Sequence, residues 1–433
     1  MLALSTLLLS SVWHAATAVG HVIQRDFDDS QLAGNDTGNW TEPVRGDYIW
    51  TPTCKLPTQK EYPYGMSYNL HDGCPSATGT LNAFMFFVDF PDAVDGGSPK
   101  ALHDKMVPGA TEWYEKASYG KLKLKVTADT SAYHRMPKPI AEYNWMGRNG
   151  NGWFIEPYIQ DAIDAFTAKG TRSPPEVDVL YIVPTGRAAN YMARSITRYE
   201  PISTRQGKKV TFKKTVTFGA ADWDLNAKTM IHETGHTICL PDYYSFSSYA
   251  GLYVGGYSIM AQTEGIAPDF FAWDKYRLGW IQDKAVDCVL EAGSTTHVLT
   301  PLAVDGAGKK AVVIAGSETT ALIAEVRIPA GVDEKVCAPG VILTTINTRM
   351  AAGNGLIKVV DATPGSLGCV GNLDDLNDAA LSLTLKGSKS LAYAPVSSLD
   401  VPGWDVKVTL VSVKDQEYTI RVDRKTSART DSW

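Results

Sequence analysis

Apolar residues in the first half of the chain gather in short runs of strand length. Residues 83–88 (AFMFFV) form a continuous apolar run, which is typical of a strand buried on both faces. Residues 122–126 alternate between apolar and charged side chains, as a half-buried strand does. Residues 177–183 (VDVLYIV) predict a third strand, which ends before Pro184 because proline cannot donate a sheet hydrogen bond.

Helical periodicity appears between and after these runs. Residues 111–118 predict a short helix that ends at Gly120, and apolar residues at positions 159, 162, 163 and 166 lie on one face of an amphipathic helix. A further helix is predicted over residues 224–239. Residues 208–218 carry two lysine pairs among Val, Thr and Phe, so they predict an exposed strand or hairpin whose charges discourage edge pairing.

The pattern changes after about residue 287, where helical periodicity fades and short β-rich runs recur. These runs cover residues 310–314, 321–328, 341–346, 381–385, 406–413 and 418–422, the last two joined as a hairpin. The pattern therefore predicts an α+β domain over residues 49–287, followed over residues 288–433 by an all-β domain with a sandwich-like or open-barrel arrangement.

The N-terminal residues predict export. The apolar run over residues 2–12 is too short to span a bilayer, which takes about 20 residues. With the small-residue triplet at 16–18, it predicts a secretory signal over residues 1–18. Residues 19–48 are polar and without a clear period, which leaves a flexible N-terminus and a pro-segment as alternatives. Two sequons, at Asn35 and Asn39, predict glycans on this segment of a secreted chain without a membrane anchor.

Composition narrows the class of protein. A chain of 433 residues with 44% hydrophobic and 20% charged side chains has the composition of a folded protein, and its length favours two domains. Forty-one basic and 47 acidic side chains give a net charge of −6, and no block of Lys and Arg stands out. These values exclude a disordered or fibrous protein and disfavour a nucleic-acid or anionic-membrane partner.

The six cysteines fit an oxidising compartment because an even number can pair fully as disulfides. No CxxC pair is present, so the sequence does not support a zinc ribbon or a thioredoxin-type site. Proximity along the chain favours the pairs Cys54–Cys74 and Cys337–Cys369, which leaves Cys239–Cys288.

The strongest chemical signal is the HETGH sequence that begins at His232. Two histidines four residues apart project from one face of a helix, so the imidazoles of His232 and His236 can both reach one ion at ~2.0–2.1 Å. Glu233 would then lie beside the metal-bound water and act as its general base. The alternative is a charged helix face with two solvated histidines.

A third ligand is predicted just after this helix. Proline at 241 pushes Leu240 out of the helical region, so the helix ends there and the chain can turn Asp242 back toward the two imidazoles. A carboxylate as third ligand leaves a fourth position open for water, which is typical of catalytic zinc. Three other acidic residues are near enough in sequence to replace it: Glu264, Asp269 and Asp274.

The segment HETGHTICLPDYY resembles the extended zinc motif of the immune-inhibitor-A-like metallopeptidases, which belong with the metzincins. Other segments resemble that family in the expected order, so that the resemblance covers roughly residues 80–285. These segments are VDFPD at 88–92, ASYGKL at 117–122, GYSIM at 256–260 and AWDKYRLGW at 272–280. The β-rich C-terminal part carries no motif of this kind.

The resemblance implies a metzincin-like zinc endopeptidase with an α+β catalytic domain. It implies His232, His236 and Asp242 as ligands of Zn²⁺, Glu233 as the catalytic base, and Met260 in a turn beneath the site. Read without the family, Met260 in a Gly-rich and aromatic context is a gap-filler in a core.

Cysteine 239 departs from the family pattern, which places glycine three residues after the second histidine, where the backbone turns sharply. A non-glycine residue in the left-handed region costs roughly 1 kcal/mol or more. Either the turn is built differently, or a disulfide from Cys239 helps to fix it.

The sequence therefore predicts a secreted zinc endopeptidase that acts on protein substrates. Candidate donors of a further hydrogen bond to the reacting groups are Tyr243, Tyr244 and Tyr257, each of which packing alone would also explain. One alternative is a two-His-one-carboxylate Fe(II) oxygenase. Another is a secreted binding or adhesion protein that keeps the fold without turnover, against which the intact Glu233 argues. The oxygen-rich residues 372–378 lack the spacing of a calcium loop and predict an exposed acidic turn.

Overall fold

The computed structural model describes residues 53–94, 97–143, 155–168, 170–221, 225–366, 368–369, 374–384 and 394–428. The predicted signal, the polar segment over residues 19–48 and both sequons lie outside the described residues. Within those ranges, none of the helices is both long enough and apolar enough to cross a membrane.

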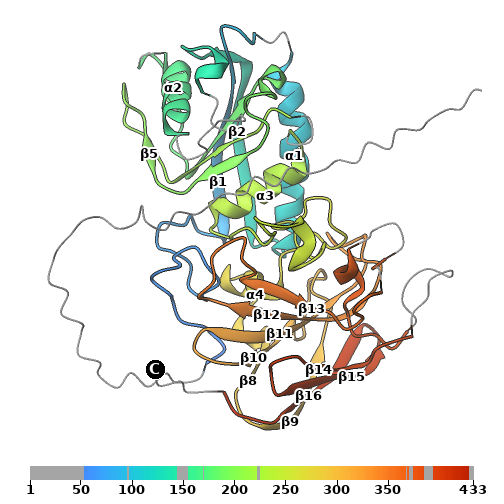
Figure 1. The fold of residues 1–433 in the computed structure, drawn as a ribbon. Helices are drawn as coiled ribbons and strands as arrows, with labels where there is room; N and C mark the ends of the chain where they lie inside the picture. Colours follow the sequence, from blue (N-terminus) through green and yellow to red (C-terminus); the bar gives the residue numbers. More distant parts are fainter. Residues whose placement is uncertain are drawn as a thin grey trace, which may run out of the picture.

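A mixed five-stranded sheet forms the upper part of the molecule (Figure 1), with the strand order β2-β1-β3-β7-β4. Strand β1 (Gly79–Asp89) pairs in parallel with both β2 (Leu122–Arg135) and β3 (Val179–Pro184). Strand β3 pairs in parallel with β7 (Lys214–Thr217), whose other edge is covered by the antiparallel β4 (Ile196–Arg198). A separate two-stranded ribbon joins β5 (Ile202–Ser203) and β6 (Thr211–Phe212).

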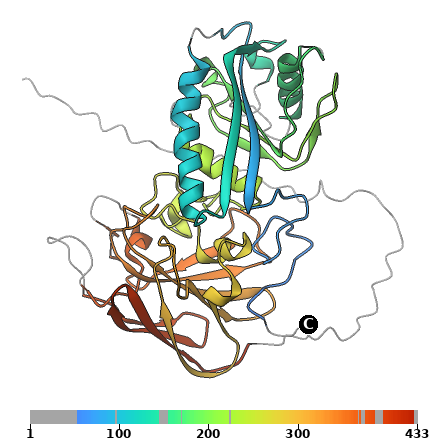
Figure 2. The same ribbon diagram turned by 180° about the vertical axis from the view of Figure 1, so that it is seen from behind.

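Strand β1 is buried on both faces, as its continuous apolar run predicts. Ala83, Met85 and Phe87 belong to one hydrophobic core, whereas the alternating residues Phe84 and Phe86 belong to a second core on the other face. Each face of the sheet must therefore pack against other elements that exclude solvent from it. Helices cover the sheet on both sides (Figures 1 and 2).

Helices α1 (Pro99–Ala117) and α3 (Ala227–Thr237) pack on the first face, and α2 (Glu156–Thr167) packs on the second. Helix α1 is longer than the predicted residues 111–118, because it begins at the N-cap Ser98 and continues through Pro108. The amphipathic periodicity of α2 is confirmed: its buried residues include Ile159, Ala162, Ile163 and Phe166.

The expectation of an exposed strand or hairpin over residues 208–218 is wrong for its second half. Strand β7 lies between β3 and β4, and all four of its residues are buried. The side chain of Lys214 is accommodated because its ammonium donates to the carbonyl of Tyr199 at 2.7 Å and lies over the rings of Tyr64 and Tyr199. A lysine can thus occupy a central strand when its charged end finds a carbonyl and aromatic faces.

Two further sheets form the lower, C-terminal part (Figure 1). The five-stranded sheet has the order β13-β12-β11-β10-β8, and the four-stranded sheet has the order β14-β15-β16-β9. The predicted strand over residues 381–385 is described as far as residue 384. In these residues Leu381 forms an isolated bridge to Val341, and no strand follows. The strands are β8 (Val286–Val289), β9 (Gly293–Leu299), β10 (Ala311–Ala315), β11 (Thr320–Arg327), β12 (Gly340–Asn347), β13 (Ile357–Val360), β14 (Ser398–Val401), β15 (Val406–Lys414) and β16 (Glu417–Arg424).

The five-stranded C-terminal sheet is a middle layer, buried on both faces. In β10, Val312 and Ile314 share a core with the four-stranded sheet. The alternating Ala311 and Val313 belong to the same core as helices α1 and α3. The hydrophobic core is therefore continuous between helices α1 and α3 and the C-terminal sheets.

Three disulfides join Cys54 to Cys288, Cys74 to Cys239 and Cys337 to Cys369. The predicted Cys337–Cys369 pair is confirmed, whereas Cys54–Cys74 and Cys239–Cys288 are wrong. Proximity along the chain misleads here because residues 53–78, named the N-terminal strap below, lie at the junction of the upper sheet and the C-terminal part (blue in Figures 1 and 2). One end of the strap is thereby fixed to β8 and the other to the end of α3.

A buried ionic cluster ties the C-terminal sheet to the helical part. The guanidinium of Arg327, at the end of β11, pairs with Glu325 at 2.7 Å and with Asp333 at 2.8 Å, and all three side chains are fully buried. It also donates to the carbonyls of Tyr257 and Phe270, which lie in the segment after α3. This one side chain therefore connects three separate segments.

Replacing Arg327 with methionine is expected to lower the free energy of unfolding by about 3–5 kcal/mol, because two buried carboxylates lose their partner. The matched control is Arg421→Met, whose pair with Asp423 lies on the surface at 48% and 36% side-chain exposure and contributes little. Urea unfolding of both variants measures the difference. Equal stabilities would contradict the assigned role of Arg327.

Candidate metal centre

Helix α3 brings the HETGH residues into the interior. The helix starts at Asn226, whose side-chain oxygen accepts hydrogen bonds from the backbone amides of Lys228 and Thr229. Such an N-cap satisfies amides that have no partner inside the helix. Residues 229–237 are all buried, so the alternative of a solvated helix face is wrong for His232 and His236.

The two imidazoles converge on one point together with the predicted third ligand. The rings of His232 and His236 are perpendicular to each other, at 89°, and their Nε2 atoms are 3.1 Å apart. The Oδ1 atom of Asp242 lies 3.2 Å from each Nε2. Within the described part of the chain, these three residues form the one group of His, Cys or acidic side chains that could hold a metal ion.

Backbone carbonyls fix the orientation of both rings. The Nδ1 atom of His232 lies 2.8 Å from the carbonyl oxygen of Ile259, and that of His236 lies 2.7 Å from the carbonyl oxygen of Leu240. A carbonyl accepts only, so each Nδ1 carries the donated hydrogen and each neutral ring keeps its lone pair on Nε2. Both lone pairs then point at the position shared with Asp242. Metal-binding histidines are typically oriented by this kind of contact.

The arrangement fits a divalent cation. Ligand atoms at 2.0–2.1 Å from a tetrahedral zinc lie roughly 3.3 Å from one another, close to the separations of 3.1 and 3.2 Å found here. The Oδ1 atom of Asp242 is buried and has no hydrogen-bond partner among the described residues. A buried carboxylate oxygen without a donor is unfavourable unless a cation completes it. Two imidazole nitrogens and one carboxylate oxygen are a common catalytic zinc ligand set.

Electrostatics at the centre favours a positive charge between the three groups. Burial by itself lowers the pKa of an imidazole, but the adjacent Asp242 carboxylate outweighs burial and raises the pKa of His236 to about 9. Burial raises the pKa of a carboxyl group, yet the charges of the two imidazoles hold the pKa of Asp242 well below its ordinary value.

The segment after the helix forms a floor beneath the centre. A Cβ atom added to Gly235, which lies between the two histidines, would be 2.5 Å from the sulfur of Met260, so Met260 packs directly against the helix. The carbonyl of Met260 accepts a hydrogen bond from the amide of Tyr243, next to the third ligand. The turn at residues 258–260 thus contacts the candidate metal-binding residues through both Ile259 and Met260.

Glutamate 233 is oriented by a residue that the sequence did not indicate. The hydroxyl of Thr197, on the edge strand β4, donates to Oε2 of Glu233 at 2.7 Å. Tyr199, the residue after this strand, places its hydroxyl 3.2 Å from Nδ1 of His236. A short, unpatterned strand such as β4 carries no signal that reveals its register against α3, so sequence reasoning could not have found either residue.

The other acidic candidates have different partners. Asp269 pairs with Lys275 at 2.6 Å, and Asp274 accepts a hydrogen bond from Tyr243 at 2.6 Å. Glu264 pairs with Lys228 near the surface. None of the three belongs to the group around the two histidines, so Asp242 is the carboxylate that the structure brings to the imidazoles.

The three candidate tyrosines differ in what their hydroxyl groups contact. The hydroxyl of Tyr257 donates to the carbonyl of Asn377, and that of Tyr243 is engaged by Asp274, so both act in packing. Tyr244 lies beside the centre, with its ring centroid 6.4 Å from that of His232. The nearby Asp242 carboxylate, with burial and Glu233, raises the pKa of Tyr244 well above its ordinary value. Its hydroxyl therefore stays protonated, and it forms a hydrogen bond with the Asp242 carboxylate.

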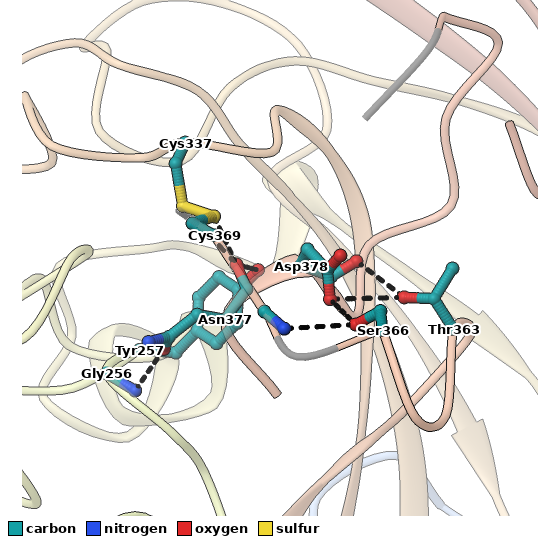
Figure 3. Close-up of a disulfide and its surroundings, with 9 residues drawn as sticks. Gly256, Tyr257, Cys337, Thr363, Ser366, Cys369, Asn377 and Asp378 are labelled. Carbon is teal, nitrogen blue, oxygen red and sulfur yellow. Dashed lines mark hydrogen bonds between the residues drawn. A yellow bond between two sulfur atoms is a disulfide. The ribbon is translucent and has the colours of Figure 1, made fainter. Parts of the chain in front are cut away.

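The acidic segment near residue 378 lies beside the Cys337–Cys369 disulfide and contacts Gly256 and Tyr257, in the segment after α3 (Figure 3). Asn377 and Asp378 are fully buried, so the predicted exposed turn is wrong for these two residues, whereas residues 372–373 lie outside the described ranges. The side-chain oxygen of Asn377 accepts from the amide of Gly256 at 2.8 Å. The Oδ1 atom of Asp378 accepts from Ser366 at 2.6 Å, beside the Cys337–Cys369 disulfide.

The chain matches no protein-family model and no curated protein. The resemblance over residues 80–285 consequently stays a prediction. The geometry of His232, His236 and Asp242 is therefore the foundation of the functional argument.

The purified protein is expected to bind one Zn²⁺ per chain, and His236→Gln is expected to weaken this binding by about a hundredfold or more. Changes to residues that merely orient a ligand cost about 10- to 100-fold, and here a ligand itself is lost. Competition with a chromophoric chelator measures the affinity. The control is His297→Gln, which alters a histidine paired with Asp287 at 2.8 Å in the C-terminal part. Similar weakening in both variants would contradict the assigned site.

Proposed function

We propose that the protein is a secreted, metzincin-like zinc endopeptidase that hydrolyses protein substrates. The observation that carries the proposal is the convergence of two imidazole lone pairs and one carboxylate oxygen within 3.2 Å, with Glu233 adjacent in the same helix. A bound zinc ion supplies Lewis acidity, which makes water a nucleophile near neutral pH and polarises a carbonyl group. The three disulfides fit an oxidising, extracellular compartment.

The side chains around the candidate metal centre have separate roles in the proposed reaction. Among the described residues, His232, His236 and Asp242 are the three that converge, so they would hold the cation and leave a fourth position open. Glu233 accepts the proton of the attacking water and delivers it to the leaving amine, as a general base and then a general acid. The hydroxyl of Thr197 holds the Glu233 carboxylate in a fixed orientation at 2.7 Å.

Access to the centre supports a catalytic rather than a structural site. The side chains of His232, His236 and Asp242 keep 11%, 8% and 19% exposure, so solvent reaches the ligands. A structural zinc is usually enclosed by four protein ligands, and a fourth one is lacking among the described residues. Tyr244 lies beside His232 with a protonated hydroxyl that is hydrogen-bonded to Asp242; turned toward a bound substrate, the same hydroxyl donates to an oxygen that gains negative charge.

The variant Glu233→Gln is expected to keep zinc at wild-type affinity and to lose peptide hydrolysis by about 10²–10⁴-fold, because an amide cannot accept the proton. The control Glu264→Gln removes a carboxylate that pairs with Lys228 outside the centre, and it should leave kcat unchanged. Casein cleavage and metal content, measured with and without chelator, test both. Undiminished turnover in Glu233→Gln would contradict the mechanism. Iron in place of zinc, or no chelator-sensitive cleavage, would favour the oxygenase or binding-protein alternatives.

Replacing Tyr244 with phenylalanine is expected to lower kcat by about tenfold or more while KM stays close to wild type, in protein saturated with zinc. A donor that stabilises charge only in the transition state affects kcat in this way. Tyr257→Phe is the matched control, since its hydroxyl donates to a buried backbone carbonyl instead. Steady-state kinetics on a fluorogenic peptide separates the two, and an unchanged kcat in Tyr244→Phe would remove this residue from the reaction.

A further inference from the structure

The turn between the second histidine and the third ligand contains a backbone conformation that glycine normally adopts. Cys239 has φ of 69°, in the left-handed region, and it is the third residue after His236 and the third before Asp242. L-residues other than Asn and Asp rarely adopt this conformation because the Cβ atom approaches the carbonyl oxygen. Cys239 is also almost fully buried, at 1% exposure.

The hydrogen bonds around Cys239 form a Schellman motif. The amide of Leu240 donates to the carbonyl of Gly235 at 3.0 Å, and the amide of Cys239 donates to the carbonyl of His236 at 2.9 Å. This motif requires a left-handed residue at the position of Cys239, where glycine is the usual choice. The turn therefore has the conformation that is typical of glycine, although the residue at this position is a cysteine.

Two parts of the metal centre depend on this turn. The carbonyl of Leu240, the next residue, orients the ring of His236 through a 2.7 Å contact with Nδ1. Asp242 follows two residues later, and the amide of Tyr243 is fixed to the carbonyl of Met260. If Cys239 relaxed to the right-handed region, the Leu240 carbonyl and the Asp242 carboxylate would both leave their positions.

The N-terminal strap holds the turn from outside. Cys74 is bonded to Cys239, across 165 residues of sequence. The strap also packs at the same end of the helix through Tyr64, whose ring centroid is 4.4 Å from that of Tyr199, the residue beside Nδ1 of His236. The covalent bond and the aromatic contact therefore act on the same small region.

We infer that the Cys74–Cys239 disulfide is a positioning device for the metal ligands. It holds Cys239 in the left-handed conformation and thereby fixes the Leu240 carbonyl and Asp242. The inference rests on the proposed zinc centre. It also implies that the centre reaches full affinity only after this disulfide has formed, so that metal loading follows oxidative folding.

Two variants without the disulfide test the inference: Cys74→Ala with Cys239→Ala, and Cys74→Ala with Cys239→Gly. Both lack the cross-link and differ only in the residue at the left-handed position. The alanine variant is expected to bind Zn²⁺ about fivefold or more weakly than wild type and to show an altered Co²⁺ absorption spectrum. The glycine variant is expected to recover the affinity to within about twofold, together with the wild-type spectrum, because glycine adopts φ near 69° without a penalty.

A third variant, Cys54→Ala with Cys288→Ala, removes a cross-link that does not touch α3. It should lose stability but keep zinc affinity and the Co²⁺ spectrum. Equal affinities in the alanine and glycine variants, or weakened binding in the Cys54/Cys288 variant, would overturn the positioning role and leave the disulfide as a general cross-link. If the alanine variant does not fold, the glycine variant alone decides: wild-type affinity supports the inference, and weakened affinity overturns it.

The wild-type protein, measured in the same titrations, separates this inference from the proposed function. If the wild-type protein binds no Zn²⁺, the proposed metal centre is wrong, and so is the positioning role of the disulfide. Wild-type protein that binds Zn²⁺, with no difference among the variants, would remove only the positioning role.

Discussion

Three electron-rich atoms held within 3.2 Å of one another are the constraint on which the centre depends. Two imidazole lone pairs and a carboxylate oxygen repel at this distance unless a cation or a proton lies among them. The protein enforces the approach with backbone groups, because the carbonyls of Ile259 and Leu240 engage the far nitrogen of each ring. A carbonyl moves only with its segment, so the ligand positions are set by the packing of the turns that carry these carbonyls.

Those turns are held by residues far away in sequence. Arg327 in β11 donates to the carbonyl of Tyr257, and Asn377 accepts from the amide of Gly256, just before the turn at residues 258–260. The C-terminal sheets therefore act as a structural partner of the centre, through a continuous core and a buried ionic cluster. Charged groups are rarely buried unless paired, and here the pairing connects separate segments.

Sequence patterns within a single segment predicted those helices and strands whose burial is determined by that segment alone. The apolar run of β1 and the periodicity of α2 report burial directly, and the HETGH spacing places two histidines on one helix face. Pro241 indicated that the helix ends before Asp242, although α3 already ends at Thr237 rather than at Leu240, because the left-handed Cys239 turns the chain first. Long-range contacts had no such signal: Thr197 reaches Glu233 across the sheet edge, and Cys74 pairs with a residue 165 positions away. The burial of β7 was also missed. Lys214 in this strand suggested exposure to solvent, but its ammonium donates to a backbone carbonyl and lies over two aromatic rings.

Anomalous scattering from crystals of the protein, measured on both sides of the zinc absorption edge, shows whether His232, His236 and Asp242 jointly bind one zinc ion. A single strong peak in the anomalous difference density is expected among Nε2 of both histidines and Oδ1 of Asp242, with an open position toward solvent. Zinc density at another place, or none at this position in zinc-saturated crystals, would show that these three residues do not form the site.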